Sequence, residues 1–289
     1  MNRMLQQRWR HYFLLMRLDR PVGIYLLLWP CMWALWVAAE GVPGGLNLAV
    51  FIVGVVLMRS AGCVINDYAD RNIDPHVERT KNRPLASGAV SKKEALLLAA
   101  GLAFLAFLGV LLLNTLTIWL SLVAVVLAAI YPFMKRYTHM PQIFLGLAFG
   151  WGVPMAFAAE TNAIPPEAWL LLAATVVWAT AYDTIYAMMD RKEDLRIGVR
   201  STAILFGTAD KAIIGVLQAL VILILFLVGQ RLSLGGYYQL ALGIGALLMV
   251  YQQYLIRYRD AAGCMKAFKN NHWFGMVMFL GVAAHYALA

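Results

Sequence analysis

The chain has 289 residues, of which 62% are hydrophobic and 13% are charged. A soluble globular domain has about 45–50% apolar and about 25% charged residues, so this composition excludes an ordinary soluble protein. A soluble core of this size has too little interior to bury so much apolar surface. The sequence therefore predicts a polytopic membrane protein in which lipid surrounds many of the side chains.

Residues 1–20 have the pattern of an amphipathic helix that lies on a membrane surface. Leu5 and Trp9 share one helical face, and Arg3 and Arg10 recur beside that face seven residues apart. An apolar stripe flanked by arginines is typical of an interfacial helix and not of a spanning one.

Residues 21–289 are predicted to form a single, all-α transmembrane domain. A helix needs about 20 mainly apolar residues to cross the hydrocarbon layer. Nine segments approach this length: Val22–Ala39, Leu46–Ile65, Glu94–Leu113, Leu116–Phe133, Pro141–Ala159, Ala168–Met188, Ala212–Val228, Gly236–Ile256 and His272–Leu288. Gly152 and Pro154 predict a kink in the fifth segment, and Gly146 and Gly150 form a GxxxG that predicts close helix packing.

The basic residues alternate between the two sides of this arrangement. Every Lys and Arg except Arg59 and Arg231 lies before the first segment or after an even-numbered one. Because Lys and Arg stay on the cytoplasmic side, the pattern predicts a cytoplasmic N-terminus and, after nine crossings, a C-terminus outside. The net charge of +9 is therefore mainly a signal of topology, and no nucleic-acid partner is expected.

The acidic residues gather in two clusters at predicted cytoplasmic ends. The first contains Asn66, Asp67, Asp70 and Asp74, and the second contains Asp183, Asp190 and Asp194. On helices that continue past the membrane face, the last two members of each cluster lie one turn apart on one side. Matching positions are offset by 120 residues, which predicts internally duplicated helix pairs.

The paired carboxylates predict a metal site. Carboxylates one helical turn apart repel each other, so each pair needs a cation. Mg²⁺ typically takes one or two carboxylates together with the phosphate oxygens of a substrate. The predicted ligands of Mg²⁺ on a diphosphate are Asp70, Asp74, Asp190 and Asp194. A solvated run of mixed charge is the alternative for either cluster alone, but two matched clusters on one side favour the metal site.

Other side chains near the clusters suit a diphosphate substrate. The candidates for binding it are Arg71, Arg79, Tyr131, Lys135 and Arg191. Asp183 lies within an otherwise apolar segment, where an ionisable side chain is costly and marks a functional candidate. An ion-coupled transporter also uses acids in duplicated helices, but it would place them near the middle of the membrane.

These residues closely resemble the motifs of the UbiA superfamily of membrane prenyltransferases. The matches are Asn66–Asp74 to NDxxDxxxD, Tyr131 and Lys135 to YxxxK, and Asp190 and Asp194 to DxxxD. Two further stretches, Arg79–Leu85 and Tyr182–Ala187, are similar to the bacterial 4-hydroxybenzoate polyprenyltransferases within that superfamily. The resemblance covers most of the chain.

The resemblance implies a magnesium-dependent enzyme of the bacterial inner membrane whose active site faces the cytoplasm. Its implied reaction transfers a polyprenyl group, often octaprenyl, from its diphosphate in the lipid phase to ring carbon 3 of 4-hydroxybenzoate, a step of ubiquinone biosynthesis. A related enzyme that uses another aromatic acceptor is the alternative. No obligate protein partner is implied.

Roles in this reaction follow for the polar residues of the clusters. Asn66, Asp67 and Asp183 are expected to bind the phenol of the acceptor, with one aspartate as the base. Arg136 is expected to bind its carboxylate by ion pairing. The allylic carbon becomes cationic, and aromatic faces attract cations. The tyrosines near enough in sequence for this are Tyr68, Tyr131, Tyr182 and Tyr186.

Overall fold

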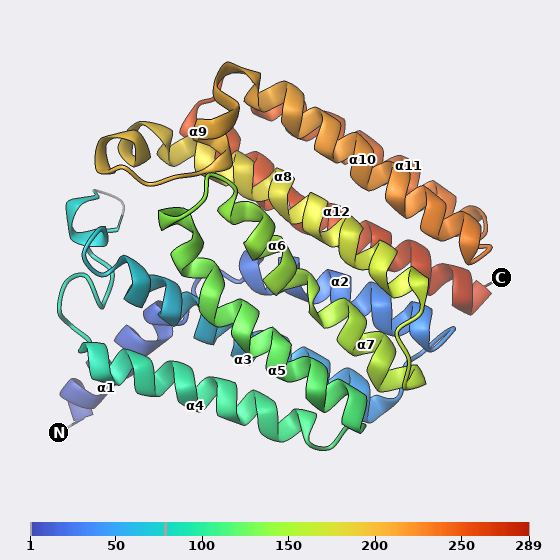
Figure 1. Ribbon diagram of the computed structural model, residues 1–289, viewed down its shortest axis with the longest axis horizontal. Coiled ribbons are helices and arrows are strands. Elements are labelled where there is room, and N and C mark those ends of the chain that lie inside the picture. Colours follow the sequence, from blue (N-terminus) through green and yellow to red (C-terminus); the bar gives the residue numbers. More distant parts are fainter. Residues whose placement is uncertain (1, 78–79, 289) are drawn as a thin grey trace.

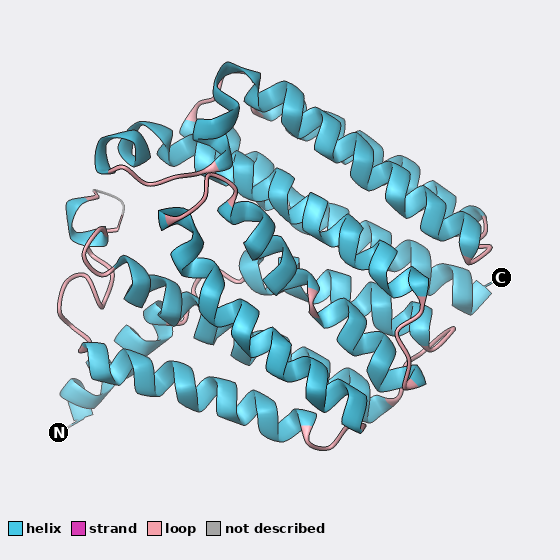
Figure 2. Ribbon diagram, in the orientation of Figure 1, coloured by secondary structure: helices cyan, strands magenta, loops and turns pink. Residues whose placement is uncertain are grey.

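The computed structural model describes residues 2–77 and 80–288. These residues form helices joined by loops and contain no strand (Figure 2). Only helices or closed barrels satisfy every backbone polar group inside lipid, so the helical fold agrees with the apolar composition. The long helices lie alongside one another, and the two termini are at opposite ends of the bundle (Figure 1).

The nine predicted segments all fall on helices. The bounds are α1 Asn2–Leu15, α2 Val22–Ala38, α3 Gly45–Asp70, η1 Asp74–His76, α4 Lys92–Val110, α5 Thr115–Ile130, η2 Tyr131–Arg136, α6 Pro141–Gly150, α7 Gly152–Thr161, α8 Pro166–Ile197, α9 Thr202–Phe206, η3 Gly207–Ala209, α10 Asp210–Arg231, α11 Gly236–Leu255 and α12 Ala261–Leu288. The fifth segment is shared by α6 and α7, and the others correspond to α2–α5, α8 and α10–α12.

Six helical segments in the described part of the chain are long and apolar enough to cross a membrane. They are Gly45–Asp70, Lys92–Val110, Thr115–Arg136, Pro141–Thr161, Pro166–Ile197 and Thr202–Arg231. The helix Val22–Ala38 is apolar but shorter. Within α10–α12, Gln218 Nε2 donates to Gln252 Oε1 at 2.8 Å, and Gln252 Nε2 donates to Asn270 Oδ1 at 3.0 Å. Such polar residues lower the hydropathy of α11 and α12, which are not among these six segments.

The predicted kink in the fifth segment is present. α6 ends at Gly150, α7 begins at Gly152, and Pro154 lies in the first turn of α7, where a missing N–H costs no hydrogen bond. The GxxxG also packs closely, as predicted. A Cβ on Gly146 would lie 2.9 Å from the Val176 backbone of α8, so α6 approaches α8 more closely than a larger residue allows.

Helix α1 lies against the ends of α3 and α4. Arg8 Nη2 and Tyr12 Oη donate to Glu94 Oε1 of α4 at 2.9 and 3.1 Å. Leu15 is fully buried, whereas Trp9 is 70% exposed and therefore available to a surrounding phase. The exposed aromatic ring is compatible with an interfacial helix, which stays a prediction.

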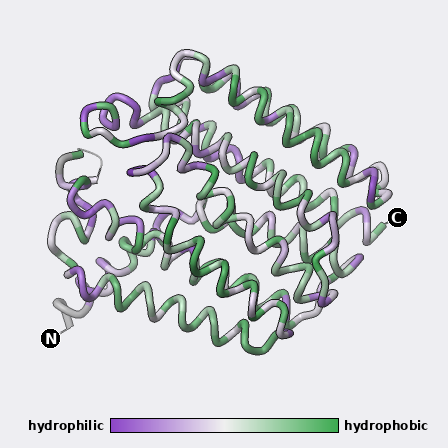
Figure 3. The backbone as a smooth tube through the Cα atoms, viewed as in Figure 1, coloured by the Kyte–Doolittle hydropathy of each residue, from purple (hydrophilic) through white to green (hydrophobic). Residues whose placement is uncertain are grey.

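Aromatic rings form the centre of the core between α2, α8 and α12. Trp33 and Trp178 stack with ring centroids 5.4 Å apart, and Phe274 packs 5.2 Å from Trp178. Hydrophobic residues extend along the helices, and hydrophilic ones gather most at the end with α1, α9 and the loop after α3 (Figure 3). The core therefore holds α8 in a position that brings its polar end to this side of the bundle.

Candidate active site

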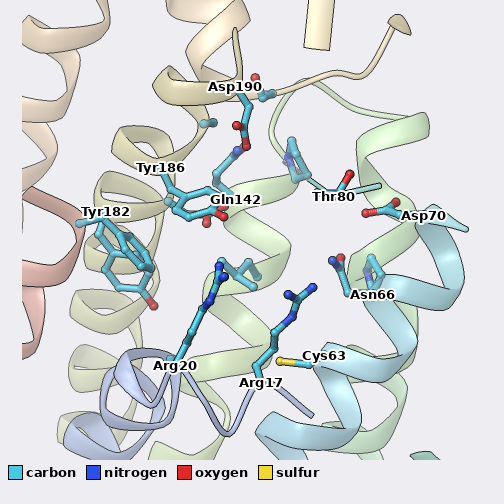
Figure 4. Close-up of a pocket in the computed structure, with 18 of the residues that line it drawn as sticks. Arg17, Arg20, Cys63, Asn66, Asp70, Thr80, Gln142, Tyr182, Tyr186 and Asp190 are labelled. Carbon is cyan, nitrogen blue, oxygen red and sulfur yellow. The ribbon is translucent and has the colours of Figure 1, made fainter. Parts of the chain in front are cut away.

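A cavity of about 770 Å³ lies at this polar end of the bundle. Its lining includes residues of α2, α3, η2, α6, α8 and α12 and of the segment that joins α1 to α2. In Figure 4, Asn66 and Asp70 reach it from the α3 side, whereas Tyr186 and Asp190 reach it from the α8 side. Both acidic clusters therefore meet in one space, although 120 residues separate them in the sequence.

The first cluster lies at the end of α3. Asp67 and Asp70 belong to the last helical turn and are 1% and 6% exposed, and Asp74 begins the short helix η1 and is 5% exposed. The expectation that this helix continues through Asp74 is wrong. In a continued α-helix Pro75 would have no N–H for the Arg71 carbonyl and its ring would clash with that carbonyl, so the chain turns between Asp70 and Asp74.

Basic side chains from distant segments bind the carboxylates of the first cluster. Arg17 Nη2 donates to Asp67 Oδ1 at 2.8 Å. Arg83 Nη1 bridges Asp67 Oδ1 at 3.1 Å and Asp74 Oδ2 at 2.8 Å, and Lys135 pairs with Asp70. These cations allow three buried carboxylates to stay close together, since buried charge is tolerated when it is paired.

The ionisation of Asp74 reflects this crowding. Burial raises the pKa of Asp74 above its ordinary value, while the neighbouring Arg83 guanidinium acts in the opposite direction. The nearby carboxylates of Asp70 and Asp67 raise the pKa further. A divalent cation at this position would stabilise the ionised form in the same way as Arg83.

The second cluster lies on one uninterrupted helix. α8 runs for 32 residues to Ile197, so Asp190 and Asp194 are one turn apart on the same helix, as predicted. Both line the cavity, and Asp183 lines it two turns further in. Tyr186 and Tyr182 of α8 line the same wall and form edge contacts with Phe268 of α12, with centroids 5.0 and 6.0 Å away.

The carboxylates offer oxygen atoms of the kind that bind metals, but they do not form a closed cage. Within residues 2–77 and 80–288, no group of three or more His, Cys, Asp or Glu side chains is arranged to hold a metal by itself. The two pairs instead line opposite walls of one cavity. All-oxygen donors of this kind suit Mg²⁺, which usually completes its coordination with water and substrate phosphate oxygens.

The other predicted site residues divide into two groups. Asn66, Tyr131 and Lys135 line the cavity. Arg71, Arg136 and Arg191 are outside its lining and bind protein groups instead: the carbonyl oxygens of Tyr68, Ala69 and Gly207, respectively. Arg79 lies outside the described residues. The roles assigned to these four arginines stay predictions.

Other basic residues that line the cavity were not assigned to it from the sequence. They are Arg17, Arg20, Arg59, Arg83, Arg200 and Lys269. In Figure 4, Arg17 and Arg20 point into the cavity from the segment between α1 and α2. Apart from Arg83, which lies in the stretch Arg79–Leu85, the members of this group outside the apolar segments have no sequence feature that separates them from the other basic residues.

Arg59 differs from the other five basic residues of this group, because it lies within the apolar part of α3. It lines the main cavity and also a second, apolar cavity of about 140 Å³, as do Tyr131 and Phe149. Its Nε is buried without a hydrogen-bond partner, and its guanidinium lies 5.7 Å from the centre of the Phe149 ring. A cation in this place marks the boundary between the polar cavity and the apolar one.

The second cavity extends the site along apolar helix faces. Its lining comes from α2–α7 and includes Val50, Phe51, Ala106 and Met155. This arrangement offers a hydrocarbon chain an apolar surface that begins at Arg59 and Tyr131. We call this second cavity the apolar groove. The polar cavity and the apolar groove together suit a molecule with a charged head and a long apolar tail.

Comparison with protein families matches residues 27–281 to the UbiA prenyltransferase family. The chain is 60% identical to a 4-hydroxybenzoate octaprenyltransferase of Nitrosococcus oceani over 285 residues, which cover 99% of this chain and 100% of that protein. It is also 60% identical to a protein of the same name from Hahella chejuensis, covering 95% of this chain and 92% of that one.

Solved structures share the fold. The apo structure of a UbiA homolog from Aeropyrum pernix K1 matches with a TM-score of 0.79 at 26% identity, covering 89% of this chain and 96% of that one. A UbiA homolog from Archaeoglobus fulgidus, bound to GPP and Mg²⁺, matches with a TM-score of 0.71 at 16% identity, covering 96% and 98%. The helical arrangement in Figure 1 is therefore the fold of these membrane proteins.

Proposed function

The chain belongs to the UbiA prenyltransferase family, and we propose that it is a 4-hydroxybenzoate polyprenyltransferase. It transfers a polyprenyl group, octaprenyl by analogy with its relatives, from the diphosphate to ring carbon 3 of 4-hydroxybenzoate and releases diphosphate. The product is an intermediate of ubiquinone biosynthesis. The observation that carries this proposal is the meeting of both carboxylate pairs in one cavity beside an apolar groove.

The four outer carboxylates of the two clusters are the proposed magnesium ligands. They are Asp70, Asp74, Asp190 and Asp194. Their all-oxygen chemistry fits this metal, and the Archaeoglobus fulgidus homolog of the same fold was solved with GPP and Mg²⁺. The metal, when bound, supplies positive charge that stabilises the departing diphosphate.

Cationic side chains of the cavity, together with the Tyr131 hydroxyl, are proposed to bind the rest of the diphosphate. Lys135 and Tyr131 keep their expected roles, and Arg200 and Lys269 line the same cavity. Fixed cations aimed at a leaving group stabilise the charge that develops as the carbon–oxygen bond breaks. Arg71 and Arg191 are not included in this proposal, because the structure pairs their guanidinium groups with protein oxygens.

Asn66, Asp67 and Asp183 are proposed to bind the acceptor phenol. Asp67 already accepts hydrogen bonds from Arg17 and Arg83, so these two side chains occupy its carboxylate oxygens. We therefore assign the phenol proton to Asp183. Its transfer raises the electron density of the ortho carbon, which bonds to the allylic carbon as the carbon–oxygen bond to diphosphate breaks. The ring carbon then loses its proton to the released diphosphate, and Asp183 returns the first proton to the phenolate oxygen as the ring becomes aromatic again.

Arg59 is proposed to bind the carboxylate of the acceptor. The earlier candidate, Arg136, donates to the Ala69 carbonyl and lies 5.5 Å from the centre of the Phe133 ring, outside the cavity lining. Arg59 lines the cavity with an unsatisfied Nε. An arginine in an apolar span is costly unless it has a functional partner, and a benzoate carboxylate is such a partner.

The apolar groove is proposed to hold the prenyl chain next to the diphosphate site. Tyr131 and Phe149 lie where the groove meets the cavity. Their rings, together with Tyr182 and Tyr186, offer faces that stabilise a cationic allylic carbon and help to exclude water. A groove that remains accessible along helix faces can accept chains of different length.

The proposed arrangement in the membrane has nine spans, with the N-terminus and the cavity on the cytoplasmic side of a bacterial inner membrane and the C-terminus outside. Six apolar helices and the opposite placement of the two termini support it. Helix α1 lies on the membrane surface, and α2–α12 form one domain. The gathering of basic loops at the cavity end supports this sidedness.

Product analysis tests the proposed function. Membranes that contain the protein are supplied with Mg²⁺, octaprenyl diphosphate and either 4-hydroxybenzoate or a dihydroxynaphthoate, and the products are identified by mass spectrometry. We expect prenylated 4-hydroxybenzoate, dependent on Mg²⁺ and absent from the Asp70→Asn variant. If only the naphthoate were prenylated, the proposed acceptor would be wrong. If neither compound were prenylated, the proposed function itself would be wrong.

A further inference from the structure

Asp210 is a buried carboxylate that binds two arginines at the cavity end of the bundle, outside the cavity lining. It is the first residue of α10 and is 0% exposed. Arg259 Nη2 donates to its Oδ1 at 2.7 Å, and Arg259 Nε lies 3.0 Å from both oxygens. Arg191 Nη1 donates to its Oδ2 at 3.3 Å. Such a set of charge-assisted hydrogen bonds specifies the positions of the groups that it joins.

Three separate segments converge on this carboxylate. Arg191 belongs to α8, Arg259 to the connection between α11 and α12, and Asp210 to the start of α10. Each arginine also donates to the backbone of η3, Arg191 to the Gly207 oxygen at 2.9 Å and Arg259 to the Thr208 oxygen at 2.8 Å. The cluster therefore joins the end of α8 to α10 and to the loop before α12.

The end of α8 is less buried than the part of the helix before it. From Met189 to Gly198 no residue is buried, whereas most residues from Trp178 to Met188 are. Adjacent residues of a helix point about 100° apart, so Asp190 can face the cavity while Arg191 faces Asp210. The contact to Asp210 is thus placed one residue from a proposed metal ligand.

We propose that Asp210 is a positioning residue for the metal–diphosphate half of the site. Through Arg191 it fixes the position of the α8 turn that carries Asp190 and Asp194 relative to the carboxylates of the first cluster. The proposal rests on the proposed function, in which these two aspartates bind the metal. It assigns Arg191 to Asp210 and gives it no direct contact with the diphosphate.

The first test replaces Asp210 and measures the magnesium dependence of prenyl transfer. In Asp210→Asn we expect the Mg²⁺ concentration for half-maximal rate to rise about tenfold, since loss of a group that orients metal ligands typically weakens metal binding at least this much. The KM for 4-hydroxybenzoate stays within about twofold, and high Mg²⁺ restores most of the rate. Asp210→Glu, which keeps the charge, recovers most of the magnesium affinity.

A matched control lies on the same two helices at their other end. Arg231 Nε of α10 donates to Glu167 Oε1 of α8 at 2.9 Å. Glu167→Gln removes this ion pair between α8 and α10 without touching the cavity, so its magnesium dependence is expected to match that of the unmodified protein. An equal effect of Glu167→Gln would mean that general helix pairing is responsible, and would overturn the proposal.

A second variant tests the link to α8 in a protein that keeps Asp210 paired with Arg259. Arg191→Gln is expected to raise the half-saturating Mg²⁺ concentration as Asp210→Asn does. The double variant is expected to need no more Mg²⁺ than either single variant, because both changes remove the same contact between Arg191 and Asp210. If Arg191 binds the diphosphate directly, high Mg²⁺ fails to restore Arg191→Gln and the two effects add. Either of those results would overturn the proposal, as would an unchanged magnesium dependence in a folded Asp210→Asn protein.

Asp190→Asn separates this inference from the function on which it rests. Loss of magnesium-dependent activity in Asp190→Asn, together with normal magnesium dependence in Arg191→Gln and Asp210→Asn, would contradict only the role of Asp210. Normal activity in Asp190→Asn would contradict the proposed metal site itself.

Discussion

The two acidic clusters place carboxylates in one cavity by different structural means. At the end of α3 the helix stops at Asp70, the chain turns, and Asp74 follows on a separate short helix. Ion pairs to Arg83 and Lys135 hold these carboxylates from the cavity side. On α8 the helix continues without interruption, and the ion pair that fixes its end, between Arg191 and Asp210, lies outside the cavity lining.

This difference indicates how the two walls respond to substrate. A metal and a diphosphate that enter the cavity meet Arg83 and Lys135 directly, so these cations can exchange a carboxylate for a phosphate oxygen. The α8 wall keeps its supporting ion pair, because that pair is on the other side of the helix. The first cluster, called here the α3 cluster, is therefore expected to rearrange locally. The second cluster, on α8, is expected to act as the fixed wall.

The largest expected effect comes from removing one metal ligand on either wall. Asp70→Asn and Asp190→Asn are each expected to reduce the rate of prenyl transfer by about 10²–10³-fold, because the charge that stabilises the leaving group is lost. The rate is measured with saturating substrates over a range of Mg²⁺ concentrations. Chelation of the metal should abolish activity in the unmodified protein. Full activity in either variant would contradict the proposed metal site.

Arg83→Gln tests whether the α3 cluster depends on its internal cations for stability. Arg83 is 13% exposed and bridges carboxylates that are 1% and 7% exposed, and removing one partner from a buried ion pair leaves an uncompensated charge. We expect the free energy of unfolding to fall by about 2–3 kcal/mol, and Mg²⁺ to restore part of it by replacing the lost cation. Thermal unfolding in detergent with and without Mg²⁺ measures both.

Arg8→Gln is the control for this measurement. The ion pair of Arg8 with Glu94 is largely exposed, with side chains 65% and 29% exposed, so its loss is expected to destabilise the protein much less than the loss of Arg83. Equal destabilisation by the two variants, or no response of Arg83→Gln to Mg²⁺, would contradict the role given to the cations of the α3 cluster.

Arg59→Gln tests whether α3 also carries the acceptor half of the site. Its loss removes a charge-assisted hydrogen bond to the benzoate carboxylate, worth about 1.5–3 kcal/mol, so the KM for 4-hydroxybenzoate is expected to rise at least about tenfold. The magnesium dependence should stay unchanged. Arg136→Gln is the matched variant. A larger rise of the KM in that protein would mean that Arg136, and not Arg59, binds the carboxylate of 4-hydroxybenzoate.

Much of this arrangement was predictable from sequence, because hydropathy and charge act locally. Apolar runs predicted where the helices lie, and the small residues Gly146 and Gly150 predicted the close packing of α6 on α8. The spacing of the acids predicted Asp190 and Asp194 on one helix face. These features depend on neighbours a few residues away, which the sequence displays directly.

The partners of the basic residues were not predictable in the same way. Arg191 follows a metal-ligand candidate and was expected at the diphosphate, yet it binds Asp210, which is 19 residues further along the chain. Arg17 lies in the segment 1–20, which is predicted to lie on the membrane surface, and nothing in the sequence indicates that its guanidinium binds Asp67, 50 residues away. A long basic side chain can reach several sites, and only the packing of distant helices selects one of them.

The smallest predicted effect concerns the connection between α1 and the α3 cluster. Arg17 adopts a left-handed backbone conformation, with φ 58°, and its guanidinium binds Asp67 from the segment that follows α1. Arg83 still binds Asp67 in an Arg17→Gln variant, so we expect only about a fivefold loss in kcat/KM for 4-hydroxybenzoate, equivalent to about 1 kcal/mol. Steady-state kinetics at saturating Mg²⁺ measure it. A loss about tenfold larger would mean that the segment after α1 supports the α3 cluster as strongly as Asp210 is proposed to support α8, by roughly the same factor as the loss of a group that orients metal ligands. The two walls would then be held alike.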